Sequence, residues 1–506
     1  MLNIVVKSAE EIKKAVKKKI NIVWIKRDIR TQDHEPLYYA ETLNEDYLII
    51  YIFDSELLCY GDLSLRHHQF VYSSISDVNE KLKKYKRSIN IFYDLSKNIF
   101  RYLAELYDIK NVLSYKETGI RASWNRDNSV QRVFNSKNIN WIQFDKQGVK
   151  RGIKSRDGWD KNWYYYVNQE IKQTNFSVSD LSNKFEKFLL PTNFRNQIAN
   201  YSNSFLKAGE NEAHKVLESF AFERNLNYSK YISKPLKSHK SCSRLSPYLA
   251  WGNISVRQAY QQIKRTDSNI INKRSVNAFT ARLKWRSHFI QKFESDCDYE
   301  NKFINRAYEN IKFDENTSFL QKWKEGLTGY PLVDATMRCL IETGWINFRM
   351  RAMLVSFLCH HLNQDWRNGI YHMSNMFLDY EPGIHYTQFQ MQAGLTGFNT
   401  IRIYNPIKQS IEHDSLGEFI KKWVPELRDM NSSEIHEPWL HNKCYSLFDN
   451  IDNSSKYNDP IVPPVKSVVK SRQQLWSIKK NKFAKSESKR LMALHVRKRT
   501  TRLKRN

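Results

Sequence analysis

The sequence predicts an α/β fold in two parts: an N-terminal domain built on a doubly wound parallel sheet, and an all-α domain after it. Within the first 150 residues, short runs rich in β-branched and aromatic residues alternate with helical stretches, which is typical of a parallel sheet with helices on both faces. Beyond residue 240 the apolar residues recur with helical spacing instead. A chain of 506 residues is long enough for two or three domains.

The expected strands are the most β-rich runs of the N-terminal part: "INIVWI" (20–25), "YLIIYIF" (47–53), "INIFY" (89–93), "NVLSY" (111–115) and "INWIQF" (139–144). Between the second and third of them, "LSLRHHQFVYSSISDVNEKLKKY" predicts a helix. The first strand is followed by "WIKRDIRTQDHEPL" and not by a GxGxxG motif, so this is not an ordinary dinucleotide-binding module.

Composition places the boundaries between the parts. The stretch after the last expected strand is polar and aromatic with few strand signals, which predicts a connector with some helix. Near the C-terminus, "PIVPPVK" precedes a basic, partly helical tail. We therefore expect an α/β domain at 1–150, a connector at 151–235, a helical domain at 236–460 and a basic tail at 461–506.

Two segments carry the helical prediction. "YPLVDATMRCLIETG" places four apolar residues on one face, Val333, Met337, Leu340 and Ile341, and it closes with Gly344, a typical residue after a helix end. "WINFRMRAMLVSFLCHHL" (345–362) is apolar on most sides and predicts a buried helix, although it contains Arg349 and Arg351. Buried arginines need anionic partners.

Composition also limits the class of protein. The longest apolar run is about eight residues, far below the roughly 20 that cross a membrane. The N-terminus lacks the apolar core of a signal peptide, so we expect a cytoplasmic protein that does not bind membranes. The six cysteines form no CxxC pair, which argues against a zinc site; we expect free thiols in a reducing compartment and no metal.

The net charge of +28 is strongly basic. Residues 466–506 contain 15 lysines and arginines and one acid, Glu487, so half of the excess lies in the tail and half on the folded body. A polyanion, most simply nucleic acid, is the favoured partner. A solvated charge excess that serves solubility is the alternative, and for the tail a disordered extension is an equal alternative to phosphate contacts.

A run of hydroxyl residues offers an anion site. In "SCSRLSPYLAWGNIS" (241–255), serines and Arg244 precede a helix expected to begin near Pro247. Backbone N–H groups at a helix start, serine hydroxyls and an arginine together can hold a phosphate. An ordinary helix cap, with Ser246 before Pro247, is the alternative.

Five motifs, taken in order along residues 20 to 430, resemble those of the cryptochrome/photolyase family: "IVWIKRDIRTQDHEPL", "SRLSPYLAWGNIS", "KWKEGLTGYPLVDATMRCLIETGWINFRMRAMLVSFL", "DWRNG" and "IRIYNPIKQSIEHDSLGEFIKKWVPEL". The resemblance implies a helical domain that binds FAD in a folded, U-shaped conformation. It also implies an N-terminal domain that in many members holds an antenna pigment, whose identity here stays open. The implied partner is ultraviolet-damaged DNA, and we expect a monomer.

Position-by-position matching assigns the FAD contacts. At the phosphate and ribityl region they are Tyr231, Cys242, Ser243, Arg244, Leu245 and Ser246. Around the rest of the pocket they are Trp285, Arg286, Trp345, Phe348, Arg351, Asp379, Glu381 and His385. The resemblance pairs Arg351 with Asp379 beside the isoalloxazine, which gives the buried arginine a partner. The unusual composition of "FLDYEPGIHYTQFQMQAGLTGFN" (377–399) then fits a wall that meets the polar edge of a flavin.

The sequence departs from the family at the flavin. His385 stands where DNA-repairing members usually have an asparagine facing flavin N5. Phe389 and Phe313 stand where the inner and outer tryptophans of an electron-transfer chain are expected, while Trp366 matches the middle one. An imidazole near N5 can exchange a proton with the flavin; a neutral histidine that only shapes the pocket is the alternative.

The substrate side departs as well. Arg282 replaces the glutamate with which pyrimidine-dimer photolyases bind the lesion, and Phe348, Ala352 and Met391 replace other lesion contacts. The histidine pair of the (6-4) branch is absent, and no cysteine set matches the iron–sulfur branch, which leaves such a cluster open. We predict catalytic roles for four residues, His385, Arg282, Trp285 and Trp366.

Three functions compete on this sequence. The first is a light-driven DNA repair enzyme, a carbon–carbon lyase that passes an electron from photoexcited reduced FAD to a dipyrimidine lesion flipped into the pocket. The second is a cryptochrome-type blue-light receptor without repair activity, which the altered residue at N5 favours. The third is a basic nucleic-acid-binding protein without flavin. The basic folded body places repair first.

Overall fold

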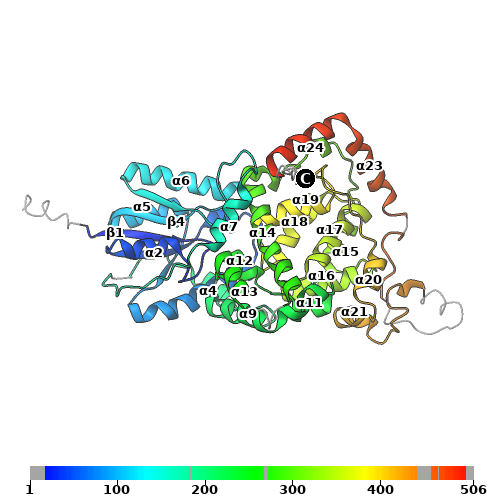
Figure 1. Ribbon diagram of the computed structural model, residues 1–506, viewed down its shortest axis with the longest axis horizontal. Helices are drawn as coiled ribbons and strands as arrows, with labels where there is room; N and C mark the ends of the chain where they lie inside the picture. Colours follow the sequence, from blue (N-terminus) through cyan, green and yellow to red (C-terminus); the bar gives the residue numbers. More distant parts are fainter. Residues whose placement is uncertain (1–16, 182–183, 267–271, 441–456, 465, 497–506) are drawn as a thin grey trace, which may run out of the picture.

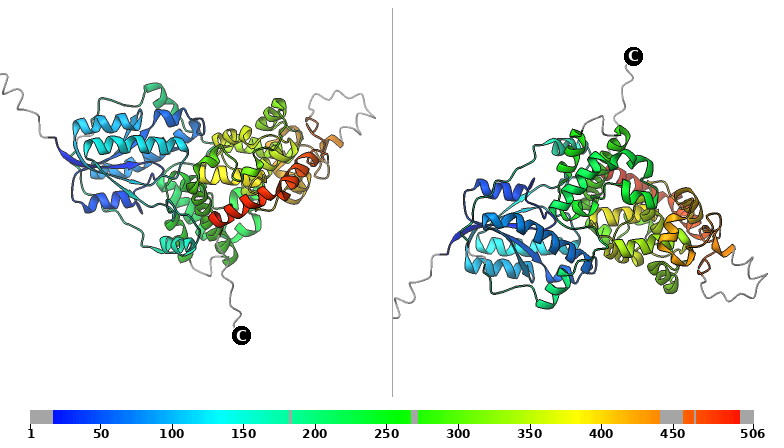
Figure 2. Two further views of the ribbon diagram at one scale, coloured as in Figure 1. Left: turned by 90° about the horizontal axis from the view of Figure 1, so that it is seen from above. Right: turned by 90° about the horizontal axis from the view of Figure 1, so that it is seen from below.

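The computed structural model describes residues 17–181, 184–266, 272–440, 457–464 and 466–496. Two parts lie along the long axis of the molecule, a sheet domain at the N-terminus and a helical domain after it (Figure 1). Figure 2 shows the same two parts from two further directions.

A five-stranded parallel sheet forms the core of the N-terminal domain, with the strand order β3-β2-β1-β4-β5. Its strands are β1 (Lys19–Ile25), β2 (Tyr47–Phe53), β3 (Ile89–Tyr93), β4 (Asp108–Tyr115) and β5 (Asn140–Phe144). The helices of this domain are α2 (Glu35–Thr42), α3 (Ser55–Leu58), α4 (Leu65–Leu82), α5 (Ser96–Leu106) and α6 (Arg121–Lys137). The five predicted strands and the doubly wound topology are therefore confirmed.

Apolar residues cover both faces of the sheet, which explains why its strands are hydrophobic almost throughout. One face packs Val23 and Ile49 against Phe70 of α4. The opposite face packs Trp24 and Ile50 with residues of α5 and α6.

Helices make up most of the remaining chain. They are α7 (Trp159–Asn168), α8 (Thr192–Ala199), α9 (Glu210–Phe222), α10 (Tyr228–Tyr231), α11 (Pro235–Ser241), α12 (Ser246–Trp251), α13 (Val256–Arg265), α14 (Lys273–Ser295), α15 (Thr317–Glu325), α16 (Pro331–Thr343), α17 (Phe348–Ser356), α18 (Trp366–Met376), α19 (Pro382–Gln392), α20 (Pro406–His413) and α21 (Glu418–Trp423). Short turns lie at Lys83–Tyr85, Arg224–Asn227, Cys297–Glu300, Arg306–Tyr308 and Pro425–Leu427, and a π-helical turn at Phe357–His361 continues α17. The predicted helical domain is confirmed.

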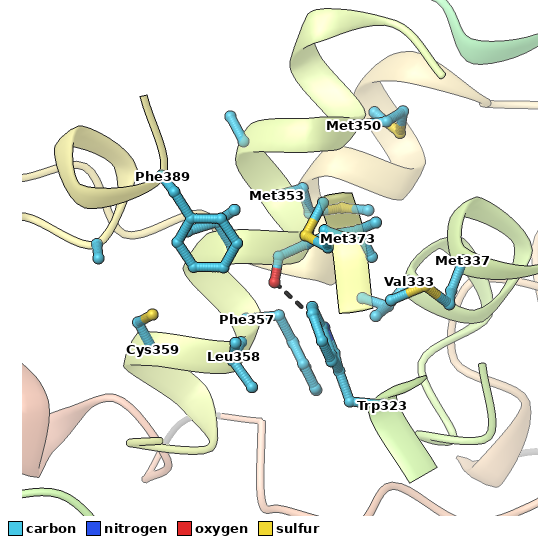
Figure 3. Packing of buried hydrophobic residues seen from close by; sticks show 14 of the residues in the cluster. Trp323, Val333, Met337, Met350, Met353, Phe357, Leu358, Cys359, Met373 and Phe389 are labelled. Atoms are coloured by element: carbon cyan, nitrogen blue, oxygen red, sulfur yellow. Dashed lines mark hydrogen bonds between the residues drawn. The ribbon is translucent and has the colours of Figure 1, made fainter. Parts of the chain in front are cut away.

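Helices α14 and α19 are the centre of this domain, and they pack closely along their lengths. Gly383 makes the approach possible, because a Cβ at this position would lie 2.6 Å from the Cα of Ile290. Around them, large apolar side chains such as Trp323, Met353 and Phe389 fill a continuous core (Figure 3). The indole N–H of Trp323 donates a hydrogen bond to the carbonyl of Leu354, 3.2 Å away.

The C-terminal part of the described chain folds back onto the helical domain as α23 (Val469–Lys480) and α24 (Lys482–His495), drawn in red in Figure 1. Leu475 and Leu491 anchor the two helices in the core. Ser471 donates a hydrogen bond to the carbonyl of His360 (2.8 Å). This stretch of the basic tail is therefore ordered protein surface.

Among the described residues, no helix is both long and apolar enough to span a membrane. Within the same ranges, histidine, cysteine and acidic side chains form no group of three or more that could hold a metal ion.

Candidate functional site

A cavity of about 740 Å³ opens between α12, α14, α17 and α19. This volume is within the range of small-molecule and cofactor sites. Twelve of the sequence-predicted site residues line it: Cys242, Ser243, Arg244, Ser246, Arg282, Trp285, Arg286, Trp345, Phe348, Arg351, Asp379 and Glu381. Residues from four separate stretches of the chain thus meet around one space.

Two buried ion pairs form one wall of the cavity. Arg286 donates to the carboxylate of Glu381 at 2.9 Å and to the side-chain oxygen of Gln147 at 2.7 Å. Arg351 donates to Oδ2 of Asp379 at 2.6 Å, which supplies the anionic partner that a buried arginine requires. Burial lowers the pKa of Arg286, and the charge of Glu381 opposes this shift.

Arg244 also lines the cavity, from the turn before α12. Its backbone is left-handed (φ 59°), and its guanidinium lies 4.1 Å from the centre of the Trp345 ring. Burial lowers the pKa of Arg244 to about 10 and raises that of Cys242 to about 12, so at neutral pH the arginine is charged and the cysteine is a thiol. Ser246 is the first residue of α12 and not its cap, because Leu245 occupies the position before the helix.

Two polar atoms in this lining lack a partner, and both fit FAD. Arg244 Nε is a buried cationic donor without an acceptor, and Asp379 Oδ1 is a buried anionic acceptor without a donor. FAD carries phosphates that accept hydrogen bonds and an isoalloxazine edge whose N–H donates one. A buried unpaired polar group is costly, so both atoms indicate a ligand of this mixed character.

His385 lies behind this wall, in an adjoining cavity of about 40 Å³ that shares Arg351 and Asp379 with the larger one. Its Nε2 donates to the carbonyl of Ile370 at 2.9 Å, so Nδ1 is the unprotonated nitrogen. Burial lowers the pKa of His385 to about 4. The histidine is therefore neutral near pH 7. This favours a neutral histidine that only shapes the pocket over one that gains or loses a proton near neutral pH.

Trp366 does not line the cavity. It is buried in the core, with ring centres 6.5 Å from Phe389 and 6.0 Å from Phe303. Phe303 in turn stacks with Phe313 at 6.5 Å. A row of rings therefore leads outward from the site, but Trp366 is its one readily oxidised member.

Trp285 lies at the mouth of the cavity and is 55% exposed. Beside it, the guanidinium of Arg282 lies 5.2 Å from the centre of the Phe348 ring. The mouth thus presents an open aromatic face and an exposed cation, both on α14.

Besides His385 and Trp366, two further predicted residues lie outside the lining. Tyr231 does not line the cavity, whereas Tyr228, one turn earlier in α10, does, and Leu245 is buried in the core that includes residues of the sheet. The sequence analysis missed Gln388 and Gln392, which line the cavity from α19. Their spacing of four from each other and from Ile384 was a usable signal, because it places three residues on one helix face.

Comparisons with known proteins agree with this geometry. Residues 21–151 match the family described as DNA photolyase, and residues 279–477 match the FAD binding domain of DNA photolyase. A deoxyribodipyrimidine photo-lyase of Alkalihalophilus pseudofirmus is 26% identical over 441 residues, covering 83% of this chain and 90% of the relative. A cryptochrome DASH of Synechocystis is also 26% identical, with the same coverage.

Solved structures share the fold. A bacterial class III photolyase from Agrobacterium tumefaciens superposes with a TM-score of 0.80 at 21% identity, covering 93% of this chain and all of that one. An archaeal photolyase from Sulfolobus tokodaii, solved with two FAD molecules, gives 0.74 at 24% identity, covering 93% and 99%. The chain belongs to the photolyase/cryptochrome family, and its helical part is a FAD-binding domain.

Proposed function

We propose that this protein is a light-driven DNA repair enzyme that uses FAD to split a dipyrimidine lesion. The observation that carries the proposal is Trp285, a large aromatic side chain held 55% exposed at the mouth of the flavin cavity. An open indole face at the entrance of a pocket is suited to stacking on a base that has been flipped out of the duplex.

The wall residues orient the cofactor. When bound, FAD supplies the light-driven electron transfer. Asp379, fixed by Arg351, keeps Oδ1 free to accept a hydrogen bond from the flavin edge. Arg244 offers Nε to a phosphate oxygen from the turn before α12. Both groups are already held in place, so binding requires little reorganisation.

The mouth residues position the substrate. Trp285 stacks on the extruded bases, and Arg282 is available to hold a carbonyl or a phosphate of the lesion in place of the usual glutamate. The charged guanidinium can donate several hydrogen bonds but accept none. The lesion is therefore recognised through its acceptor atoms at this position.

A blue-light receptor without repair activity is the second candidate. The observation that favours it is the environment of His385, a neutral histidine beside the pair of Arg351 and Asp379 where repair enzymes of the family usually have an asparagine. In this case light would change contacts of the protein and leave DNA intact.

An antenna pigment belongs to the proposal as well. The carboxyl ends of β1, β2 and β4 surround a cavity of about 80 Å³, lined by Tyr51, Lys26 and Arg126 among others. Ligands of open α/β sheets bind at such a switch point of the strand order. This cavity is too small for the ring system of a pigment, so the side chains that line it have to move outward when a pigment binds.

The deciding experiment uses the purified protein with its flavin. The visible spectrum is recorded, and the protein is then illuminated with a reductant and an ultraviolet-damaged oligonucleotide, with cyclobutane and (6-4) lesions assayed separately. Loss of either lesion only in the light supports repair and identifies the substrate. A flavin that photoreduces while both lesions persist overturns repair and favours the receptor. The same assay on Trp285→Ala tests the stacking role, and Trp285→Phe, which keeps a stacking ring, is its matched control.

A further inference from the structure

Four tyrosines form a row of neighbouring hydroxyls behind the wall of the flavin cavity, and no step of the proposed function uses them. They are Tyr60, Tyr371, Tyr380 and Tyr386, and we name them the tyrosine relay. Tyr60 lies between α3 and α4, Tyr371 belongs to α18, and Tyr386 belongs to α19. Tyr380 lies in the link between α18 and α19.

The inner end of the tyrosine relay adjoins the flavin cavity. Tyr380 stands in sequence between Asp379 and Glu381, and both of these acids line that cavity. Tyr380 itself lines the smaller cavity behind the wall, together with His385, and the two ring centres are 5.3 Å apart. Tyr380 therefore lies directly behind the wall that fits the cofactor.

Hydroxyl contacts connect the members of the relay. Tyr380 donates a hydrogen bond to Oδ2 of Asp62 at 2.8 Å. Its oxygen is also 3.2 Å from that of Tyr386, and because a phenol has one proton to donate, Tyr386 is the donor in this second contact. The hydroxyl of Tyr371 interacts with those of Tyr386 and Tyr60 on its two sides.

The outer end of the tyrosine relay is nearer to solvent. Tyr380 and Tyr386 are almost completely buried, at 1% and 0% exposure. Tyr371 and Tyr60 are only half-buried. The hydroxyl of Tyr60 donates a hydrogen bond to Oε1 of Glu300, which fixes the outer phenol. The relay thus leads from the back of the flavin wall towards the surface of the protein.

A phenol gives up an electron readily only where its proton has an acceptor, because an oxidised phenol is a very strong acid. Asp62 supplies this acceptor for Tyr380. Burial raises the pKa of Asp62, which makes its carboxylate a stronger base, while the hydrogen bond from Tyr380 and the charge of Arg27 favour the ionised form. Tyr308 is the contrast in the same core: it is 0% exposed, and its hydroxyl has no hydrogen-bond partner among the described residues.

The other row of rings near the site is poorly suited to supply electrons. Phe389 borders the smaller cavity, and Trp366 lies behind it with ring centres 6.5 Å apart. Phe303 and Phe313 continue this row outward. Phenylalanine is much harder to oxidise than tyrosine or tryptophan, so this row is interrupted on both sides of its tryptophan. Every member of the tyrosine relay is oxidisable.

We propose that the tyrosine relay delivers electrons from a soluble thiol to the photoexcited flavin. One electron leaves Tyr380, and its phenolic proton passes to Asp62 along the existing hydrogen bond. An electron and a proton from Tyr386 then restore Tyr380, and Tyr371 and Tyr60 repeat this transfer outward. At the surface, a thiol restores Tyr60 with one electron and one proton, and two of the resulting thiyl radicals combine to a disulfide. In sum, the electron of the thiol reaches the flavin and its proton reaches Asp62.

The test measures light-driven flavin reduction in the DNA-free holoprotein, with dithiothreitol as the thiol. Asp62→Asn keeps an oxygen that accepts the hydrogen bond of Tyr380 but removes the base. We expect Asp62→Asn and Tyr380→Phe to slow the reduction by about a hundredfold or more, the usual contribution of a positioned proton acceptor. Reduction in the parent protein should also be slower in D₂O, because a proton moves with the electron.

Electron paramagnetic resonance gives a readout that a merely structural role would not move. The illuminated parent protein should show a phenoxyl radical, which ring-deuterated tyrosine identifies by narrowing its spectrum. This signal should be absent in Asp62→Asn and in Tyr380→Phe. In Tyr60→Phe, at a half-buried position where misfolding is no concern, the radical should still form, but dithiothreitol should quench it more slowly because the outer link is missing.

Tyr308→Phe is the matched control. It removes a buried phenol from the same core, but one without a proton acceptor, so the rate of flavin reduction and the radical signal should equal those of the parent protein. Melting temperatures near the parent value show that the variants are folded, and rates are compared per bound flavin.

Parent rates together with a parent radical signal in Asp62→Asn and Tyr380→Phe overturn the proposal. Loss of flavin reduction in Trp366→Phe, while the tyrosine variants behave as the parent protein, also overturns it and assigns the electrons to the other row of rings. The inference rests on the flavin of the proposed function and not on repair. Because no DNA is present, the relay can be confirmed while the lesion assay fails, and it can fail while chemically reduced protein still repairs DNA.

Discussion

The wall of the flavin cavity and a pair of buried basic residues, Arg156 and Lys292, contain the same kinds of charged side chain, but they solve the problem of burial differently. On the wall, Arg286 is paired with Glu381 and Arg351 with Asp379, each within 2.9 Å. Arg156 and Lys292 are as deeply buried, and burial lowers the pKa of Arg156 to about 10 and that of Lys292 to about 7. The wall balances each buried arginine with a carboxylate, whereas burial shifts Arg156 and Lys292 towards their neutral forms.

The largest effect should follow from breaking the wall. Arg286→Leu leaves the buried carboxylate of Glu381 without its cation, and breaking a buried pair in this way costs about 3–5 kcal/mol. We expect a matching fall in the free energy of unfolding, measured with urea, and loss of bound flavin measured by absorbance. Replacing both partners by leucine should recover much of the stability but not the flavin; a single variant as stable as the parent protein would contradict the pairing.

A second prediction addresses the mouth, where Trp285 is more than half exposed. Trp285→Ala should weaken binding of lesion-containing DNA by about 1–3 kcal/mol, the usual contribution of one stacked base. The melting temperature should stay near the parent value, because Trp285 is 55% exposed and little buried surface is lost. Unchanged DNA affinity in Trp285→Ala, with Trp285→Phe measured alongside, would remove the main support for a substrate at this mouth.

The third prediction uses pH on the flavin side. The pKa of His385 is lowered to about 4 by burial, so between pH 6.5 and pH 4 the unfolded chain binds a proton that the folded protein does not. Stability should therefore fall as the pH is lowered through this window, by up to about 1.4 kcal/mol per pH unit from this residue. His385→Asn should show a shallower loss in unfolding measured at pH 7, 6 and 5; an equal slope would mean that His385 is protonated in the folded protein.

The smallest effect belongs to Lys292. Lys292→Met replaces a buried amine, whose charged form is disfavoured by burial (pKa about 7), by an apolar side chain of similar length, so the free energy of unfolding should rise by about 1 kcal/mol. Urea unfolding of the DNA-free holoprotein measures this directly. A clear loss of stability would show that the ammonium contributes a structural contact, and the contrast with the wall would then disappear.

Much of the site could be predicted from the sequence, because its chemistry is local to short motifs. The ion-paired Arg351 was expected from an arginine in an apolar helix, and the structure gives it Asp379 as a partner. Leu245 and Tyr231 were misplaced because neighbours along a short helix or turn point in different directions, which only the packed backbone settles. Ser246 was similarly one residue inside its helix.

By itself, the sequence determined the strand and helix order, the family and most of the residues that line the cavity, since apolar periodicity and motif spacing are properties of neighbouring residues. Only the tertiary structure decided which charges are satisfied. Arg156, Lys292 and His495 are 136 or more residues apart in sequence, and nothing in their local patterns indicates that they meet. Whether a buried cation has an anion depends on what the fold brings within a few ångströms of it, because electrostatic stabilisation falls with distance and with exposure to water.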